Sequence, residues 1–198
     1  MDSSASPLFA PYRPRAASGT PPDRIADLVI RGAETRDAAV LGALAAEREG
    51  RDPATEAREF EARLRAVDTS RDRIWVAESA ASVIGYAKAH RFVHPDRAPA
   101  HAAPEGWYLS GVVVSSQHRR RGVGTALTLE RLRWLSQRAA RAYYFANALN
   151  RASIDLHARL GFTEMAHDFW YPGATFTGGA GILFACELAR LEASASGG

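Results

Sequence analysis

The sequence predicts an α/β domain in which helices cover both faces of one mixed sheet. Segments with strand-like patterns alternate with segments whose apolar residues repeat every three to four positions. Three consecutive strand patterns indicate a meander, and the helices that follow them indicate crossover connections. The expected order is β-α-α-β-β-β-α-β-α-β-β, within residues 25–192.

The two ends of the chain differ from this domain in composition. Residues 1–24 contain five of the ten prolines, which predicts a disordered tail. Residues 193–198 consist only of Ala, Ser and Gly, and we expect a second flexible tail. At 198 residues and 46% hydrophobic content, the part between the tails is expected to fold as one domain.

Composition also indicates the cellular location and excludes some classes of partner. No run reaches the roughly 20 apolar residues of a membrane span, and the N-terminus lacks the basic and apolar segments of a signal peptide. The lone Cys186 excludes an internal disulfide and is expected in the core. We therefore expect a cytoplasmic protein without membrane contacts. The net charge is only +3 and acidic residues interrupt the basic ones, so no nucleic-acid partner is expected. No metal site is expected either.

The first elements are a strand and two helices. Leu28–Arg31 is a short strand pattern. Thr35 is expected to cap a helix that extends to about Arg48. Pro53 suits the first turn of a second helix, which is expected to end near Val67.

A hairpin and a long loop follow. Arg73–Glu78 and Ser82–Phe92 are predicted strands, joined by a tight turn at Ser79–Ala81. Residues 94–106 are rich in Pro, Ala and His and predict a loop on the substrate side of the protein.

The next segment carries the strongest functional signal. Trp107–Val114 is a buried strand pattern, Ser115–His118 is a polar turn, and Arg119–Gly124 is a basic turn with two glycines. A helix is expected to start in this turn and to reach about Ala139. Glycines allow close approach to the backbone, and free N–H groups at a helix start attract anions. The segment therefore predicts a site for a phosphorylated ligand.

The C-terminal part adds three strands and one helix. Arg141–Leu149 is a predicted strand, and Asn150–Leu160 is a predicted helix with Gly161 at its C-terminal cap. Thr163–Tyr171 and Gly181–Leu188 are the last two predicted strands.

Two motifs and this element order resemble the GNAT superfamily of N-acetyltransferases over Leu28–Leu188. The pattern Arg/Gln-x-x-Gly-x-Gly/Ala is present as Arg119–Gly124, and Asn-x-x-Ala/Ser-x-x-x-Tyr-x-x-x-Gly-Phe is similar to Asn150–Phe162. A dinucleotide-binding fold would require the glycine turn after the first strand, whereas here it follows the fourth. The superfamily fold is therefore the expectation.

The resemblance implies acetyl-CoA as cosubstrate. A bulge near Ser110–Gly111 would separate the central strand from Arg141–Leu149 and open a V-shaped slot. Backbone groups of the central strand would pair with the pantetheine arm, and N–H groups of the basic turn would hold the pyrophosphate. Asn150 is also compatible with a helix cap alone. The implied cofactor-binding residues are Val112, Val113, Val114, Arg119, Arg120, Arg121, Gly122, Val123, Gly124, Thr125, Asn150 and Ser153.

Acetyl transfer to an amine requires a polarised thioester carbonyl and a proton for the leaving thiolate. By resemblance, the backbone N–H of Val112 would polarise the carbonyl. His157 occupies the position where the family commonly has a tyrosine acid, and it is the candidate general acid. It would donate as imidazolium or bridge through water. The alternative is that His157 only packs near the thiol; the phosphinothricin-type branch carries a similar histidine segment.

The general base remains open at this point. Many family members have a glutamate in the central strand, where this chain has Ser110 and Gly111. Water-mediated deprotonation would need no base at all. The candidate bases are Glu78, His90, His94, His101 and Glu105.

The expected acceptor is a primary amine of a small molecule, amino-acid-like or an antibiotic. The alternatives are a protein or peptide N-terminus, and a catalytically silent CoA-binding module. The acceptor pocket is expected between the first two helices, the 94–106 loop and the last two strands. Aromatic residues would form its walls or a homodimer interface: Trp107, Tyr108, Phe169, Trp170, Tyr171 and Phe176.

Overall fold

The computed structural model describes residues 24–189, apart from 67, 69 and 178. Most of the tail 1–24, the segment 190–198 and the expected helix end at Val67 lie outside the described residues. The described strands are β1 (Val29–Gly32), β2 (Asp72–Ser79), β3 (Ser82–Phe92), β4 (Gly106–Val114), β5 (Arg141–Asn147), β6 (Thr163–Ala166) and β7 (Gly181–Glu187). The described helices are α1 (Ala38–Glu49), α2 (Pro53–Arg65), α3 (Val123–Ser136) and α4 (Arg151–Ala158), with short 3-10 helices η1 (Thr35–Asp37) and η2 (Ser116–His118). The predicted element order is confirmed.

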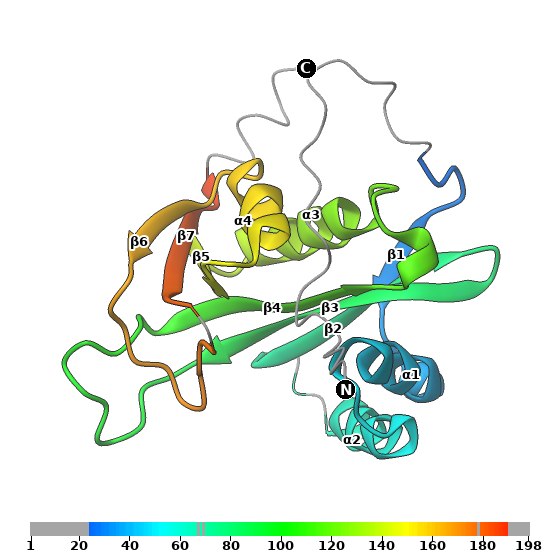
Figure 1. Cartoon of the computed structure of the whole chain (residues 1–198), viewed down its shortest axis with the longest axis horizontal. Coiled ribbons are helices and arrows are strands. Elements are labelled where there is room, and N and C mark those ends of the chain that lie inside the picture. Colours follow the sequence, from blue (N-terminus) through cyan, green and yellow to red (C-terminus); the bar gives the residue numbers. More distant parts are fainter. Residues whose placement is uncertain (1–23, 67, 69, 178, 190–198) are drawn as a thin grey trace, which may run out of the picture.

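All described strands belong to one sheet, in the order β1-β2-β3-β4-β5-β7-β6. Neighbouring strands are antiparallel except β4 and β5, which are parallel. Helices α1 and α2 cover one face, and α3 and α4 cover the other (Figure 1). The mixed sheet between two helical layers is the architecture that the sequence predicts.

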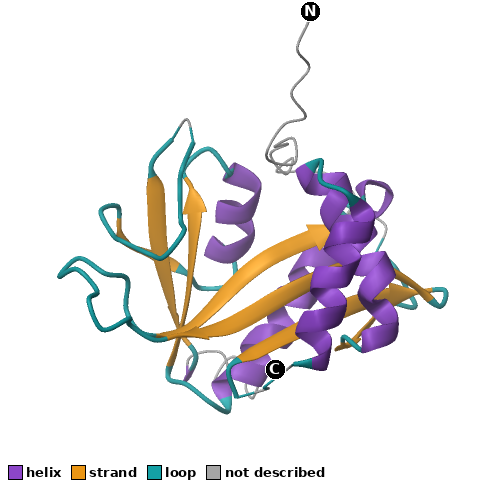
Figure 2. Cartoon of the chain, turned by 90° about the horizontal axis from the view of Figure 1, so that it is seen from below, coloured by secondary structure: helices purple, strands orange, loops and turns teal. Residues whose placement is uncertain are grey.

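The two halves of the sheet separate between β4 and β5. These strands pair only at Trp107 with Ala142 and at Tyr108 with Tyr143. Beyond that point β5 continues along β7, and Figure 2 shows the two halves diverging from a common end. The expected separation of β4 from β5 is therefore present.

A bulge in β4 lies at the point of divergence. Between two neighbouring cross-strand pairs, β4 has Gly111 and Val112 where β3 has only Ala87. Gly111 has a φ of +54°, which L side chains rarely adopt. A Cβ on this residue would lie 2.9 Å from Cε of Lys88. Glycine is thus required both for the backbone conformation and for the space beside it.

The starts of α1 and α2 refine the sequence prediction. Thr35 does not cap α1, because residues 35–37 form η1 and the α-helix begins only after Asp37. Helix α2 is capped by Asp52, whose Oδ2 accepts the backbone N–H of Thr55 at 2.7 Å. Pro53 then occupies the first turn, as expected.

Two C-terminal predictions were too long. Helix α3 starts at residue 123, after Gly122 with a φ of +87°, and ends before Ala139. Strand β6 ends at 166 rather than at Tyr171, because the chain turns to meet the 94–106 loop. There the carbonyl of Trp170 accepts the backbone N–H of Ala103 at 2.8 Å. The remaining boundaries differ by only one or two residues.

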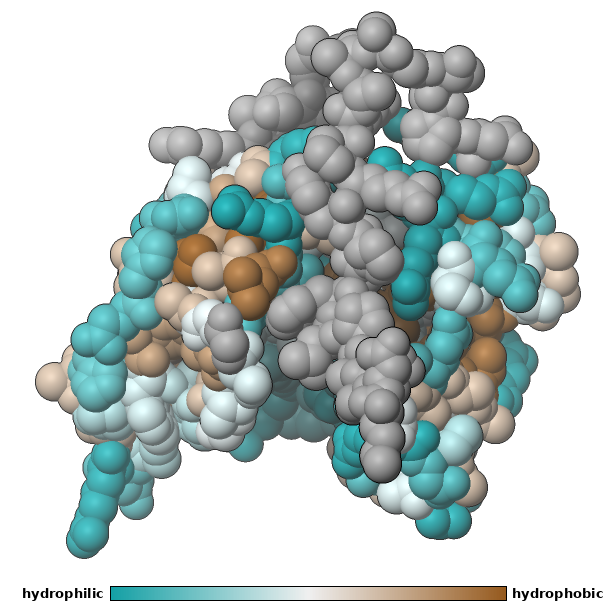
Figure 3. Space-filling model, viewed as in Figure 1, coloured by the Kyte–Doolittle hydropathy of each residue, from teal (hydrophilic) through white to brown (hydrophobic). Residues whose placement is uncertain are grey.

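The core has a layer on each side of the sheet. One cluster packs beneath α3 and includes Trp107 and the buried Cys186, and another packs beneath α1 and α2. The outer surface in Figure 3 is mixed, with a hydrophobic patch near α4, and exposed apolar side chains include Leu149 and Met165. None of the described helices is long and apolar enough to cross a membrane.

Candidate active site

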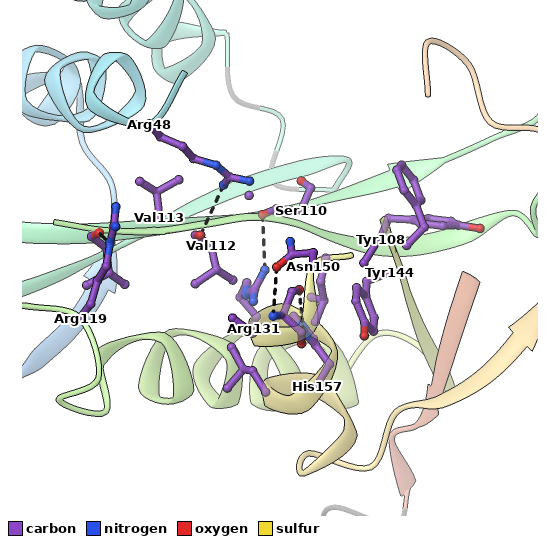
Figure 4. A pocket seen from close by; sticks show the side chains of 18 of the residues that line it. Arg48, Tyr108, Ser110, Val112, Val113, Arg119, Arg131, Tyr144, Asn150 and His157 are labelled. Carbon is purple, nitrogen blue, oxygen red and sulfur yellow. Dashed lines mark hydrogen bonds between the residues drawn. The ribbon is translucent and has the colours of Figure 1, made fainter. Parts of the chain in front are cut away.

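A pocket of about 510 Å³ lies where β4 and β5 separate. Side chains approach β4 within it from both helical layers (Figure 4). The residues that line it are Glu47, Arg48, His90, Tyr108, Leu109, Ser110, Gly111, Val112, Val113, Val114, Arg119, Arg131, Tyr144, Phe145, Ala146, Asn150, Ala152, Ser153, Leu156 and His157.

The start of α3 adjoins one end of this pocket. Its first intrahelical bond runs from the N–H of Ala126 to the carbonyl of Gly122, at 3.0 Å. The N–H groups of Val123, Gly124 and Thr125 therefore lack intrahelical acceptors and carry the positive end of the helix dipole. Apart from its own chain neighbours, no described residue has an atom within 4 Å of the position that a Cβ on Gly122 would take. This open space beside free N–H groups is the geometry that an anion requires.

The three arginines before α3 differ in position. Arg119 lines the pocket, and its Nε donates to the carbonyl of Val114 at 3.1 Å. Arg120 has a left-handed φ of +63° at the turn, and Arg121 follows it. The side chain of Val123 is buried in the core, so only its backbone can reach a ligand.

The predicted residues of β4 have distinct orientations. Val112 has no paired residue on β3 or β5, and its carbonyl lies 3.5 Å from Nη1 of Arg48. The side chain of Val113 is buried beneath α1 and α2, whereas Val112 lies beside α3, toward Gly124. The strand thus offers backbone groups of Val112 and Val114 to the pocket.

The start of α4 forms another wall. Oδ1 of Asn150 accepts the backbone N–H of Ser153 at 3.2 Å, so Asn150 is a helix cap. Both residues also line the pocket. The cap and the proposed ligand contact are therefore compatible.

His157 is buried at the base of the pocket and is neutral. Its Nδ1 lies 2.9 Å from the carbonyl oxygen of Ser153 and therefore carries the hydrogen, since a carbonyl can only accept. The ring stacks on Tyr144 with 3.9 Å between centroids. Burial, together with the charge of Arg131, lowers the pKa of His157 to about 3. This pKa opposes the imidazolium form of the predicted acid.

Sequence reasoning missed Arg131, a fully buried arginine of α3. Its Nη1 donates to the carbonyls of Lys88 at 3.0 Å and Ser110 at 3.4 Å, and its Nη2 donates to Thr128. No ion pair of Arg131 is present within the described part of the chain, and burial lowers its pKa to about 9. The four-residue spacing from Leu127 was the available signal, because it places Arg131 on the buried face of α3.

Of the five candidate bases, only His90 lines the pocket. Its Nδ1 lies 3.4 Å from Oγ of Ser110, and its Nε2 lies 2.5 Å from the hydroxyl of Tyr171. Burial, followed by the charge of Arg63, lowers the pKa of His90 to about 4. A neutral imidazole therefore lies beside Ser110 of the central strand.

The other candidate bases lie elsewhere. Glu78 pairs with Arg31, and Glu105 accepts the backbone N–H of His94 at 2.6 Å. His101 is exposed in the loop 94–106.

The aromatic prediction holds in part. Tyr108 lines the pocket, but Trp107 lies in the core cluster beneath α3. Its ring packs against that of Trp134, with 5.0 Å between the ring centroids. Phe145, which was not predicted, also lines the pocket, and a cluster of aromatic side chains surrounds it. The residues of this cluster are Tyr108, Phe169, Tyr171 and Phe176.

The sequence matches the profile of the acetyltransferase (GNAT) family over residues 38–162. The chain belongs to this family. Its members are N-acetyltransferases, of the acyltransferase class, that take the acetyl group from acetyl-CoA. A search of curated protein sequences found no match.

Solved structures share the fold. The ribosomal-protein-alanine N-acetyltransferase of Brucella melitensis is 24% identical, with a TM-score of 0.59 over 80% of this chain and 99% of that one. The protein yncA of Salmonella typhimurium, solved with acetyl-CoA, is 21% identical, with a TM-score of 0.60 over 82% and 95%. A spermidine N-acetyltransferase chimera of Vibrio cholerae SpeG and hSSAT is 16% identical, with a TM-score of 0.63 over 85% and 99%.

The residues present fit acetyl-CoA. The free N–H groups at the start of α3 and the open space at Gly122 suit a pyrophosphate. The unpaired stretch of β4 at the slot suits an extended amide-bearing arm. The unpaired stretch of β4 lines the pocket, as do residues of α4, and Gly124 at the start of α3 lies beside the lining residues Val112 and Leu156.

Proposed function

We propose that this protein transfers an acetyl group from acetyl-CoA to the primary amine of a small molecule. The observation that carries the proposal is one pocket that runs from Val114 and Arg119, just before α3, to the neutral His90 beside Ser110. Bound acetyl-CoA would supply an acetyl thioester in this pocket.

The donor side depends on backbone groups. The N–H groups of Gly122, Gly124 and Thr125, together with that of Arg120, would hold the pyrophosphate. The N–H of Val112 would donate to the thioester oxygen, where negative charge increases during attack. Fixed donors are effective here because they need no reorganisation during the reaction.

The acceptor side needs a neutral amine. His90 is neutral at pH 7 because its pKa is about 4. We assign it the role of accepting a proton from the incoming amine through the hydroxyl of Ser110, which lies 3.4 Å from Nδ1. Tyr171 would orient the ring by its bond to Nε2.

The leaving thiolate needs a proton on the α4 side. With its hydrogen on Nδ1, His157 presents a lone pair at Nε2. The ring would hold a water that passes a proton to the sulfur and takes one in turn from solvent water, which is the bridging role expected from the sequence. Replacement of His157 by Phe should lower kcat about a hundredfold while acetyl-CoA still binds.

A small acceptor is favoured over a peptide. The aromatic cluster around Phe145 occupies space on the acceptor side of the pocket, and the hydroxyl of Tyr171 is hydrogen-bonded to Nε2 of His90. A peptide N-terminus would need an open groove at this place. Location in the cytoplasm and a homodimeric state are further parts of the proposal.

The direct test is thiol release from acetyl-CoA across a panel of amines and short peptides. Turnover with small amines, with kcat about a hundredfold lower in the His90→Gln variant, is the expected result. Preference for peptides would favour the alternative N-terminal acetyltransferase. Tight CoA binding without turnover of any acceptor would instead favour a silent binding module.

A further inference from the structure

We infer that the acceptor amine carries an anionic group, such as a carboxylate, which Arg48 and Lys88 bind. This inference rests on the proposed function and names the chemistry of its second substrate. It follows from two cations on the acceptor side of β4 that the described part of the chain does not neutralise.

Lys88 lies beside the bulge, on the face covered by α1 and α2. It is the cross-strand partner of Ser110, and its Cε would lie 2.9 Å from a Cβ on Gly111. Its Nζ lies 5.9 Å and 6.0 Å from the ring centroids of Phe60 and Tyr86. Among the described residues its ammonium has no hydrogen bond or ion pair, and burial lowers its pKa.

The choice of lysine at this position is itself informative. The chain has 25 basic residues of the Lys and Arg types, and Lys88 is its only lysine. An ammonium is a compact point charge, whereas a guanidinium needs a wider, planar space. The narrow space between Gly111 and the Phe60 ring accommodates the smaller cation.

Arg48 supplies the second charge from α1. Figure 4 shows its side chain reaching toward Val112, on the opposite side of β4 from Arg131. Its one described bond, from Nη1 to the carbonyl of Val112, is 3.5 Å long and therefore weak. The guanidinium thus retains donors for a ligand in the pocket that it lines.

The nearby carboxylates are engaged elsewhere. Asp72 accepts from Nε and Nη2 of Arg63, at 2.5 Å and 2.8 Å. Glu49 and Glu56 both pair with Arg51.

Glu47 is the remaining carboxylate on the pocket wall. It accepts the backbone N–H of Ser116 at 3.3 Å, at the phosphate end of the pocket. Among the described residues the ammonium of Lys88 therefore has no carboxylate bonded to it, and a partly buried cation without such a partner is costly.

An anionic substituent on the acceptor would offset this charge. A carboxylate between Arg48 and Lys88 would leave an amine on the adjacent carbon near Ser110, because Ser110 is the cross-strand partner of Lys88. His90 adds no charge, since it is neutral. A polyamine would instead bring like charges together. The site thus selects amino-acid-like acceptors and disfavours spermidine-like ones.

The experiment compares matched acceptors. Free amino acids with small, polar and aromatic side chains are each paired with their amides, which lack the carboxylate, and spermidine is added. The measured quantity is kcat/KM for thiol release from acetyl-CoA. We expect the best acid to exceed its amide by at least about tenfold.

Two variants then locate the anion subsite. Lys88→Met and Arg48→Met should each raise KM for the acid about tenfold and bring the acid-to-amide ratio toward one. Lys88→Arg keeps the positive charge but changes the shape of the side chain. It should therefore keep part of the preference for the acid over the amide. Arg36→Gln, an exposed arginine on η1, is the matched control and should keep the full ratio.

The outcomes separate the two proposals. Equal efficiency for acids and amides, or a preference for spermidine, overturns the anion subsite while N-acetyltransferase activity stands. A ratio that both variants leave unchanged overturns the assignment of Arg48 and Lys88. No turnover with any acceptor overturns the proposed function and this inference with it.

Discussion

At the scale of single residues, burial decides the protonation of the two histidines in the pocket. His90 and His157 have pKa values of about 4 and about 3, because both rings are removed from water. The first has its hydrogen-bond partners across the sheet, and the second has its partner within its own helix. Both are neutral at pH 7, so each ring has an unprotonated nitrogen that can accept a hydrogen bond, from Ser110 on one side of β4 and from water on the other.

Replacement of His90 by Gln should lower kcat about a hundredfold, since general base catalysis typically contributes 10²–10⁴. The dissociation constant of acetyl-CoA should stay unchanged, because His90 lies on the acceptor side. Steady-state kinetics and calorimetric titration of CoA measure both. His94→Gln, in the nearby loop, is the control. Full activity of the His90→Gln variant would rule out the proton relay through Ser110.

The same pKa shifts predict a pH dependence of stability. In the unfolded chain these histidines bind protons below about pH 6.5, whereas in the folded protein they do not until about pH 4 or 3. The free energy of unfolding should therefore fall as pH drops below 6.5, by up to about 1.4 kcal/mol per pH unit for each histidine. Urea unfolding between pH 7 and pH 5 tests this slope. His157→Phe should reduce the slope, and an identical slope in the variant would contradict a neutral, buried His157.

At the scale of secondary structure elements, close contacts of backbones fix how helices and strands meet. Helices α1 and α2 cross at Gly42, where a Cβ would lie 2.5 Å from the nitrogen and 2.7 Å from Cα of Ala57. Both atoms belong to the backbone, so no side-chain rotation can make room. This contact sets the position of the α1 end that carries Arg48.

Gly42→Ala should therefore destabilise the protein although alanine has the higher helix propensity. The expected loss is about 1–3 kcal/mol, typical of overpacking. Urea denaturation measures it, and Ala43→Ser on the exposed face of α1 should cost much less. A stabilised Gly42→Ala variant would show that the two helices are farther apart than the structure has them.

At the scale of the whole molecule, the sheet opens between β4 and β5. Strand β4 is paired on one edge along most of its length, while its other edge pairs with β5 only at Trp107 and Tyr108. Arg131 lies on the α3 side of the separation between β4 and β5, and it donates to carbonyls of both β3 and β4. A cosubstrate in the gap would therefore contact both halves of the sheet, and its binding should raise the stability of the whole domain.

CoA should accordingly raise the melting temperature, by the equivalent of about 2.7 kcal/mol at a hundred times its dissociation constant. Gly122→Val should remove most of this increase, because a side chain would enter the open space at the start of α3. Gly50→Val is the matched control, since Gly50 also has a positive φ and open space but caps α1. Both variants should lose similar stability without CoA. An undiminished CoA shift in Gly122→Val would place the pyrophosphate elsewhere.

The sequence alone determined the order of elements and the family, and it predicted the donor side of the candidate site. These rest on local patterns: apolar periodicity, the glycines at 122 and 124, and free N–H groups that every helix start possesses. The bulge at Gly111 was also predictable from the resemblance and is present. A short segment contains all the information that such features need.

Only the tertiary structure decided the charges of the pocket. Lys88 meets Gly111, Arg48 meets Val112, and His90 meets Tyr171 across long separations in sequence. Whether a charge is buried, paired or neutral depends on which distant residues exclude water from it. For that reason the sequence left the base and the acceptor open. It also allowed His157 to act as an imidazolium acid, a charged form that burial of the ring disfavours.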